Sequence, residues 1–584
     1  MTDDTHAPQT VATPAASEEN VAYFSMEIGL DASIPTYSGG LGVLAGDTLR
    51  AAADLGASIT AVTLIYHNGY VRQHLDESGS QSESPFSWDP RELLEPLDAR
   101  TTIRLEGREV VIRPWRYVVE GQFGDEVPVI FLDTNLEDND PYDRTLTDHL
   151  YGGDLRYRLC QEAVLGIGGV KILDALDINS CSVYHMNEGH SALLTMALLR
   201  RVVECRDADG ATEEEMEIVR SQCVFTTHTP VPAGHDKFDW DLVRRVLPDD
   251  VCAFLEECDC SHEGMLNMTY LALRFSRYIN GVAMRHEDIS KGMFPGYPIH
   301  SITNGVHAPR WICDTFLQLF DEHVPNWRRD KQNLRYATGI PLDDIRAAHT
   351  QMRHRLIEEV NRRTGRDFKP DAFTIGFARR ATAYKRADML FSDLDRLRYI
   401  SRHVGPIQAV FAGEAHPKDE SGKQMIRDIF DAAEQLRDDM PVVWLEGYDI
   451  DLANLVIAGS DIWLNTPLKP HEASGTSGMK AALNGVPSFS VLDGWWLEGH
   501  IEGVTGWSIG DESRTSDELM EIQDMYSKLE RIIVPMFYEN PDEFARIRRS
   551  CIALNGSFFN AQRMVEQYLR AAYFSARQDG NQQE

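Results

Sequence analysis

Short apolar runs alternate with longer segments of helical periodicity along this chain, and the alternation occurs twice. In the first half we predict strands at residues 21–25, 58–66, 181–185 and 222–226, with further strands within residues 109–132. In the second half the pattern is cleaner, and we predict buried strands at residues 373–377, 407–411, 442–445, 461–464 and 488–492. Strands that alternate with helices form mostly parallel sheets covered on both faces. The expected fold is therefore α/β, with two Rossmann-like domains facing a cleft.

The pattern divides the chain into four parts. Residues 1–20 are expected to form a disordered tail, residues 21–305 the first domain and residues 306–535 the second. Helices are expected at residues 44–55 and 158–176, from His190 onward, and finally at residues 517–538 and 542–576. The last helices have no strand partners, so we expect residues 536–584 to pack back on the first domain. Neither half contains a GxGxxG fingerprint, which argues against NAD binding.

The charge balance is strongly acidic, since 57 Lys and Arg residues stand against 91 Asp and Glu residues and give a net charge of −34. Such a balance argues against nucleic-acid or anionic-membrane partners. No run of about 18 apolar residues could span a bilayer, and the segment from Met1 lacks signal-peptide features, so a cytoplasmic protein is expected. We also hypothesise that the acidic, lysine-poor surface is halophilic, because salt screens its self-repulsion.

Cysteine usage fits the same compartment. The nine cysteines are scattered without framework spacing, and we expect them to be reduced thiols. The closest cluster is Cys258, Cys260 and His262, which lacks a second half for a metal site, so we favour an exposed loop there. His185 and His190 do not have the i, i+4 spacing of a zinc-binding helix. No metal site is predicted.

The segment Glu472-Ala-Ser-Gly-Thr-Ser-Gly-Met-Lys480 carries the most specific chemistry. A glycine- and serine-rich turn can expose several backbone N–H groups to an anion, and the start of a helix adds its positive dipole end. The lysine can neutralise phosphate as a point charge, or, if desolvated, can form an imine with an aldehyde cofactor. Pyridoxal phosphate would use both the amine and the anion site. The alternative is a helix start with a solvated lysine.

Two other segments suit anion binding. Arg379, Arg380 and Lys385 follow the strand predicted at residues 373–377, where guanidinium and ammonium groups can bind phosphate. A solvated helix start is the alternative. The glycine-rich segment at residues 37–42 precedes a predicted helix and can bring backbone amides close to an anion, or can be a simple tight turn.

Together these segments resemble the α-glucan (glycogen/maltodextrin) phosphorylase family, in particular its short bacterial and archaeal members, from Val21 to beyond Trp507. The resemblance implies a GT-B type glycosyltransferase architecture. It also implies reversible phosphorolysis, in which the non-reducing-end glucosyl unit of an α-1,4-glucan or maltodextrin passes to inorganic phosphate. The product is α-glucose 1-phosphate with retained configuration. Pyridoxal 5′-phosphate on Lys480 would serve through its phosphate and not as an electron sink.

The resemblance also implies roles for single residues. Catalytic residues would be Lys480, Arg380, Lys385 and His228. Cofactor contacts would come from Lys480, Gly475, Thr476, Ser477, Gly478, Tyr448, Arg379 and Trp311. Substrate contacts would come from Gly40, Leu41, Asn304, Tyr384, Glu472 and Glu188. This chain departs from the family at Thr382 and Ala383, where His-Glu is usual, and at Glu188, where aspartate is frequent.

Two rival functions are weighed against phosphorolysis. A nucleotide-sugar-dependent glycogen or starch synthase would carry a lysine in the first glycine loop, where this chain has Tyr37 and Ser38, and would lack Lys480. An inactive glucan-binding homologue would not need the retained cations and lysine. A homodimer is one assembly we consider, and chain-length preference and physiological direction are left open by these residues.

Overall fold

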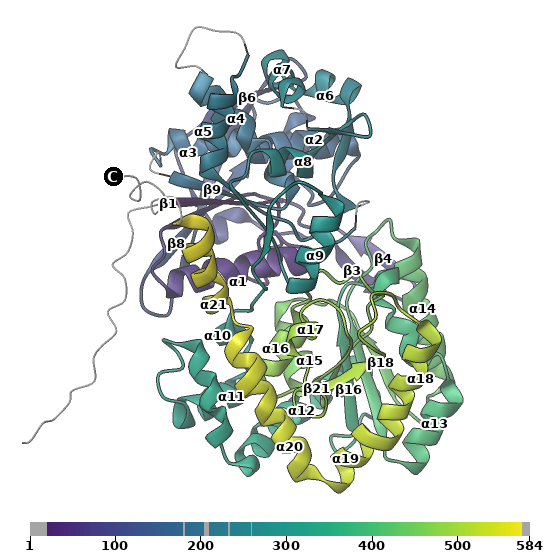
Figure 1. Cartoon of the computed structure of the whole chain (residues 1–584). Coiled ribbons are helices and arrows are strands. Elements are labelled where there is room, and N and C mark those ends of the chain that lie inside the picture. Colours follow the sequence, from purple (N-terminus) through teal and green to yellow (C-terminus); the bar gives the residue numbers. More distant parts are fainter. Residues whose placement is uncertain (1–19, 179–180, 204–209, 232–233, 259, 575–584) are drawn as a thin grey trace, which may run out of the picture.

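The computed structural model describes residues 20–178, 181–203, 210–231, 234–258 and 260–574. The predicted tail lies outside the described residues, apart from Asn20, which begins the first strand. Two large sheets organise the rest, one in the upper and one in the lower half of Figure 1. The expected α/β class is confirmed.

The first sheet has a parallel centre and an antiparallel edge. Its parallel strands lie in the order β15 (Ile299–Ser301), β14 (Tyr278–Gly281), β10 (Cys223–Thr226), β9 (Cys181–Asn187), β1 (Asn20–Ser25), β2 (Ile59–Leu64) and β8 (Glu126–Asp133). Antiparallel strands β7 (Arg108–Glu120), β5 (Glu95–Pro96) and β6 (Thr101–Leu105) extend the β8 edge. The central strands are buried along their length, as expected for a sheet with helices on both faces.

The second sheet is wholly parallel. Its strands lie in the order β18 (Val442–Leu445), β17 (Ile407–Ala412), β16 (Phe373–Ala378), β19 (Ile462–Asn465), β20 (Ser488–Val491) and β21 (Gly506–Ile509). Counted along the chain, this is the order 3-2-1-4-5-6 of the doubly wound fold. All five strands predicted in this half are present within a residue or two, and β21 was not predicted. The topological switch point lies between β16 and β19.

Helices cover both sheets. The first half contains α1 (Gly40–Asp54), α2 (Leu155–Ala163), α3 (Gly169–Ala175), α4 (Leu194–Val203), α5 (Glu213–Gln222), α6 (Trp240–Val246), α7 (Asp249–Glu257), α8 (Met268–Arg274) and α9 (Met284–Met293). The second contains α10 (Ala308–Trp311), α11 (Asp314–His323), α12 (Leu342–Thr364), α13 (Leu394–His403), α14 (Glu420–Gln435), α15 (Ile450–Gly459), α16 (Ser477–Leu483) and α17 (Trp496–Gly499). The chain ends with α18 (Glu518–Lys528), α19 (Val534–Glu539), α20 (Pro541–Ser550) and α21 (Ala561–Gln567). Two small antiparallel sheets, β3 (Arg72–Leu75) with β4 (Gln81–Ser84) and β11 (Lys237–Asp239) with β12 (Ser261–His262) and β13 (Met265–Asn267), complete the fold.

The helix predicted at residues 158–176 is confirmed by α2 and α3, which a π-helical turn at Val164–Gly168 joins without a break. A Cβ at Gly166 would lie 2.6 Å from the backbone nitrogen of Leu194, so this turn packs directly against the start of α4. Periodicity alone cannot reveal such a close backbone contact.

The helix predicted at residues 542–576 is wrong as one continuous helix, and its last two residues lie outside the described residues. It is interrupted after a π-helical turn at Cys551–Gly556, because Asn560 leaves the helix and forms a parallel bridge with Val306. The Asn560 side chain then caps α21 by accepting a hydrogen bond from Arg563 N. Beyond this break, α21 lies beside α1 (Figure 1). The Tyr573 hydroxyl lies 2.6 Å from Nδ1 of His185, which is on β9 of the first sheet.

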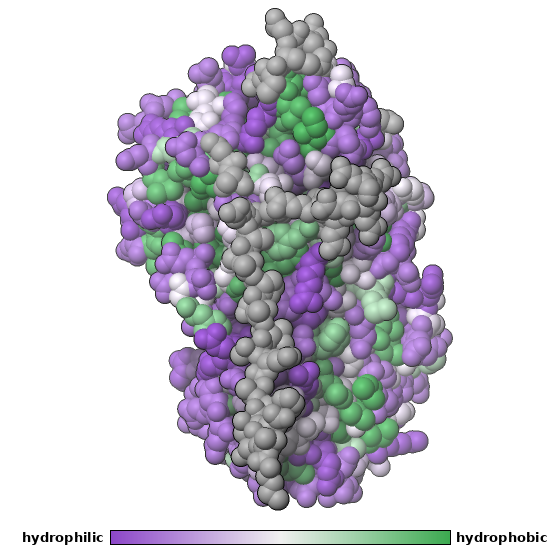
Figure 2. All heavy atoms as spheres, turned by 60° about the vertical axis from the view of Figure 1, so that its left-hand side comes forward, coloured by the Kyte–Doolittle hydropathy of each residue, from purple (hydrophilic) through white to green (hydrophobic). Residues whose placement is uncertain are grey.

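Two cysteines differ from expectation. Cys258 and Cys260 are buried, with exposed fractions of 0% and 1%, so the predicted exposed loop is wrong. Both belong to the hydrophobic core of the first half as small apolar side chains, with Cys258 Sγ 3.9 Å from Met216 Sδ on α5 and Cys260 Sγ 3.3 Å from the Leu255 carbonyl on α7. Elsewhere the outer surface is mainly hydrophilic on the face that Figure 2 shows, with smaller apolar patches between the polar residues.

Candidate functional site

Both sheets contribute strand ends to one cavity of about 1470 Å³. In open α/β sheets, ligands bind beyond the carboxyl ends of the strands. Residues that follow strands of the first sheet and line this cavity are Glu27, Glu188, His228 and Val282. Those that follow strands of the second sheet are Arg379, Glu414, Tyr448 and Glu472. The cavity therefore lies where the topology places a ligand site.

Lys480 lies on α16, with its amine directed at the cavity wall. Its Nζ atom lies 3.7 Å from the centre of the Trp311 ring. Burial lowers the pKa of Lys480 to about 8, although the nearby Asp47 carboxylate opposes the shift. Asp47 in turn accepts a hydrogen bond from Trp311 Nε1 at 2.7 Å. A lysine held in this way is a more reactive amine at neutral pH than a solvated one.

The rest of α16 fixes this amine. Asn484 donates its side-chain amide to the carbonyls of Trp311 (2.7 Å) and Lys480 (3.0 Å), so the helix and the tryptophan wall are held together. Gly475, Thr476 and Ser477 line the cavity before the helix. Gly478 does not line it, because a Cβ there would lie 2.6 Å from the Trp495 ring. Close packing against Trp495 therefore explains why residue 478 is a glycine.

A cluster of charges stands at the ends of β16 and β19. Lys385 Nζ donates to Glu472 Oε2 at 2.6 Å, and Arg379 donates to the same oxygen at 2.8 Å. Burial alone would raise the pKa of Glu472, but Arg379 and Lys385 outweigh it and lower this pKa to about 2. Burial, with help from Arg379, lowers the pKa of Lys385 despite the glutamate. Glu472 is thus the counter-ion of both cations.

Arg380 joins the second half to the glycine loop of the first. Its guanidinium donates to Ser38 Oγ at 2.7 Å, and a Cβ on Gly39 would lie 3.0 Å from the same nitrogen. Gly40 begins α1, and the space where its Cβ would lie is open. Gly40 and Leu41 both line the cavity. Helix-start amides and a guanidinium therefore converge on one region of the cavity, as an anion site requires.

The remaining predicted residues lie on other parts of the cavity wall. Backbone N–H of His228 donates to Glu188 Oε2 at 2.7 Å, so the glutamate holds the histidine loop. Burial lowers the pKa of His228 to about 3, which keeps the ring neutral. Asn304 Oδ1 is buried without a hydrogen-bond partner among the described residues, and a ligand donor could satisfy it. Tyr384 and Tyr448 also line the cavity.

Sequence reasoning missed several residues of this site. Glu27 accepts hydrogen bonds from the backbone N–H groups of Ser38 (2.6 Å) and Gly39 (3.3 Å) and from the Tyr151 hydroxyl (2.9 Å), and so shapes the glycine loop. Asp47 was missed as well. Both are charged residues among apolar neighbours, at residues 26–30 and 43–49, and that contrast was the available signal.

A second group, which includes the missed residues Arg158 and Asp236 beside His190, lines the cavity on the side of the first sheet. Arg158 donates to Asp236 Oδ2 at 3.0 Å, and His190 Nε2 lies 3.4 Å from the same oxygen. Burial, reinforced by Arg158, lowers the pKa of His190 to about 3. Glu414, from the other sheet, also faces the cavity, and burial raises its pKa to about 7. No local sequence signal connects these residues, because they come from separate elements.

No helix within the described residues is both long and apolar enough to cross a membrane. Within the same ranges, no group of three or more His, Cys, Asp or Glu residues is placed to hold a metal ion.

Comparisons with known proteins agree on one family. A model of the carbohydrate phosphorylase family matches residues 249–504. The maltodextrin phosphorylase of Thermococcus litoralis is 36% identical over 96% of this chain and 71% of its own length. The glycogen phosphorylase of Mycobacterium tuberculosis is 36% identical over the same shares, and that of Aquifex aeolicus is 33% identical over 95% of this chain and 86% of its own length.

Proposed function

This chain belongs to the carbohydrate phosphorylase family, and from that premise we propose how its cavity works as an α-glucan phosphorylase. The enzyme transfers a glucosyl unit from an α-glucan to inorganic phosphate and back. We assign the non-reducing-end unit of an α-1,4-glucan or maltodextrin as the donor and α-glucose 1-phosphate, with retained configuration, as the product. The observation that carries this assignment is the buried Lys480 amine in one cavity with Arg380, Lys385 and the glycine loop.

The residues around Lys480 fit pyridoxal 5′-phosphate. The amine is buried at a cavity wall formed by the flat Trp311 ring, and its lowered pKa suits a covalent bond to an aldehyde. Gly475, Thr476, Ser477, Tyr448 and Arg379 would hold the cofactor with it. When bound, the cofactor would supply a phosphate group that buffers proton and charge beside the substrate phosphate.

The chain itself would bind and orient the attacking phosphate. The arrangement supports Arg380 and the amides of Gly40 and Leu41 as its ligands, with Lys385 as a compact positive charge. Two phosphates at close range repel strongly unless cations lie between them, because Coulomb energy rises in a site of low dielectric. We propose that the incoming phosphate competes with Glu472 for Lys385, and that Glu472 then accepts hydrogen bonds from glucose hydroxyls.

The sugar would lie between the histidine loop and the second sheet. The backbone carbonyl of His228 would face the positive charge that develops in an oxocarbenium-like transition state. The neutral His228 ring, whose Nε2 donates to Asn187 Oδ1 at 2.7 Å, would be held in place for a sugar hydroxyl. Asn304, Tyr384 and Glu188 complete the proposed sugar contacts.

We propose a GT-B arrangement for the whole chain. In support, each parallel sheet has doubly wound strand order, and residues from both line the cavity. The proposed domains span residues 21–305 and 306–535. Of the segment expected to pack back on the first domain, α21 does so against α1, whereas α20 packs against α12 of the second half, which corrects the expected start of this segment at residue 536. Seven cysteines of the described residues are free thiols, which supports the cytoplasm as the compartment: Cys160, Cys181, Cys223, Cys252, Cys258, Cys313 and Cys551. Whether two copies form a homodimer is a separate proposal, open to analytical ultracentrifugation.

The decisive test is a phosphorolysis assay on the purified protein. With maltooligosaccharide and inorganic phosphate we expect glucose 1-phosphate, and with a nucleotide sugar we expect no glucan elongation. An absorption band of bound pyridoxal phosphate should accompany the activity and disappear in Lys480→Ala. A protein without phosphate-dependent release, or one that elongates glucan from a nucleotide sugar, would contradict the proposal.

A further inference from the structure

The turn that presents Lys385 continues into an unusual residue. Lys385 ends a short 3₁₀ helix at Ala383–Lys385, and Arg386 follows with a φ angle of 45°. This is the left-handed region, which is sterically unfavourable for a residue other than glycine. Such a conformation persists where the surroundings hold it in place.

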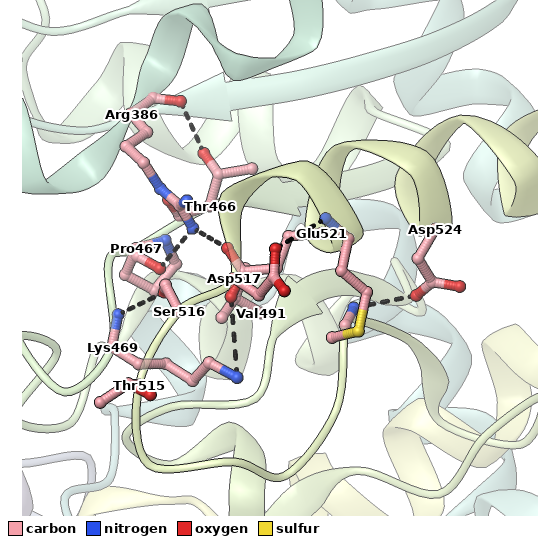
Figure 3. A network of polar contacts seen from close by, with 12 residues as sticks. Arg386, Thr466, Pro467, Lys469, Val491, Thr515, Ser516, Asp517, Glu521 and Asp524 are labelled. Atoms are coloured by element: carbon pink, nitrogen blue, oxygen red, sulfur yellow. Dashed lines mark hydrogen bonds and ion pairs between the residues drawn. The ribbon is translucent and has the colours of Figure 1, made fainter.

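Arg386 is held by a network of polar contacts (Figure 3). Its Nε donates to the Thr466 carbonyl at 3.0 Å, and its NH2 donates to the Pro467 carbonyl at 2.9 Å. NH2 also donates to Glu521 Oε2 at 2.6 Å. In the opposite direction, Thr466 Oγ1 donates to the carbonyls of Lys385 and Arg386, both at 2.9 Å. The turn at residues 385–386 and the segment at residues 466–467 are therefore held together by hydrogen bonds from side chains of both.

Glu521 comes from a distant part of the chain. It lies on α18 and has an exposed fraction of 0%. Lys469 Nζ lies 3.6 Å from its other oxygen and also donates to the Asp511 carbonyl at 2.9 Å. Neither Arg386 nor Glu521 lines the cavity. A direct contact with substrate or cofactor is thus not their role.

The role of the Arg386–Glu521 pair follows from the two segments that it joins. The segment from Thr466 continues to Glu472, and Lys385 Nζ binds that glutamate at 2.6 Å. Leu468 N also donates to the Tyr384 carbonyl at 2.7 Å, so three successive residues of the turn are tied to this segment. The relative position of the Lys385 ammonium and the Glu472 carboxylate therefore depends on how the turn and the segment are held together.

We propose that Arg386 and Glu521 are positioning residues that set the Lys385 ammonium for the substrate phosphate, an inference that rests on the proposed phosphorolysis. Lysine at position 386 would keep the charge but lose the planar fork that reaches two carbonyls and a carboxylate. Glutamine at position 521 would keep the shape of the side chain but remove the charge. Either change would let the Lys385 turn shift relative to Glu472.

The test compares Arg386→Lys and Glu521→Gln with a matched control, Arg353→Lys. Arg353 is equally buried, at 9% against 8% for Arg386, and it donates at 3.1 Å to Asp461, another carboxylate with an exposed fraction of 0%. In the holoenzyme, we expect both test variants to raise the KM for phosphate and lower kcat/KM on the order of 10-fold to 100-fold, with the KM for glucan little changed. The control should lower Tm and leave the KM for phosphate unchanged.

Equal effects of the control and the test variants on the KM for phosphate would overturn the proposal, because the pair would then be merely structural. A crystal structure of Glu521→Gln separates this outcome from a failure of the proposed function. We expect the contact between Lys385 Nζ and Glu472 Oε2 to be lost or lengthened. An unchanged contact overturns the positioning role whatever the activity, whereas absent phosphorolysis in the wild-type protein overturns only the function.

Discussion

Both ends of the second sheet carry a buried carboxylate paired with two cations, but only the group at the carboxyl end faces the cavity. At the carboxyl end, Arg379 and Lys385 bind Glu472, and all three line the cavity. At the amino end, Arg353 and Arg548 bind Asp461 at 3.1 and 2.6 Å, and none of these three lines it.

Burial and pairing alone therefore do not identify a functional charge. At the amino end the ion pairs are surrounded by packed protein, and breaking them should cost stability. At the carboxyl end the same kind of pair lines the cavity, where we propose that the substrate phosphate competes with the glutamate for its cations. Access to a cavity separates the two roles, and the following predictions test that distinction.

The largest effect is expected at Lys480. Lys480→Ala should abolish bound pyridoxal phosphate and glucose 1-phosphate release, because the variant has no amine for the covalent bond. The folded structure should survive, since the side chain lines a cavity and its removal leaves no enclosed void. Absorption spectroscopy, the phosphorolysis assay and a thermal unfolding curve measure these three quantities. Full activity in the variant would refute the role assigned to the lysine.

The second-largest effect is expected on stability, at the amino end of the second sheet. Asp461→Asn should lower the free energy of unfolding by about 3–5 kcal/mol, because Arg353 and Arg548 would lose their buried counter-ion. Urea unfolding measures this loss. The kcat/KM of the protein that remains folded should be unchanged. A stable variant with impaired phosphate binding would contradict the comparison between the two ends.

A pH series distinguishes the cations by their chemistry. Only a neutral amine attacks an aldehyde, and burial lowers the pKa of Lys480 to about 8. Uptake of pyridoxal phosphate by the cofactor-free protein should therefore rise about tenfold per pH unit up to pH 8 and level off above it. A solvated lysine would keep gaining up to its ordinary pKa of about 10.4. Stopped-flow absorbance gives the rate, and a continued rise to pH 10 would show that burial does not activate this amine.

The sequence predicted those parts of the site that are coded locally. The end of a strand, a glycine-rich loop and a lysine beside it are each recognisable from a few consecutive residues. All the predicted site residues except Gly478 line the cavity. Five strands of the second sheet were predicted closely for the same reason, because each is a short apolar run.

What sequence could not provide depends on contacts between distant residues. Glu27 meets Tyr151, and Arg386 meets Glu521, only after the chain has folded. The helix interruption at Asn560 likewise follows from its pairing with Val306. Periodicity and propensity describe one segment at a time, so they cannot anticipate such partners.

The smallest effect is expected from added salt, which separates exposed charges from the buried ion pairs of the second sheet. The net charge of −34 lies mostly on exposed side chains, and dissolved salt screens the repulsion between them. The buried ion pairs at both ends of the second sheet are screened much less. Adding KCl from low to molar concentration should therefore raise Tm by several degrees, on the scale of about 2–4 °C per kcal/mol for a large domain. The difference in unfolding free energy between Asp461→Asn and the wild-type protein should stay the same at every concentration. Equal or falling stability with added KCl would reject the halophilic hypothesis, and a difference that shrinks with salt would show that solvent reaches the pairs at the amino end.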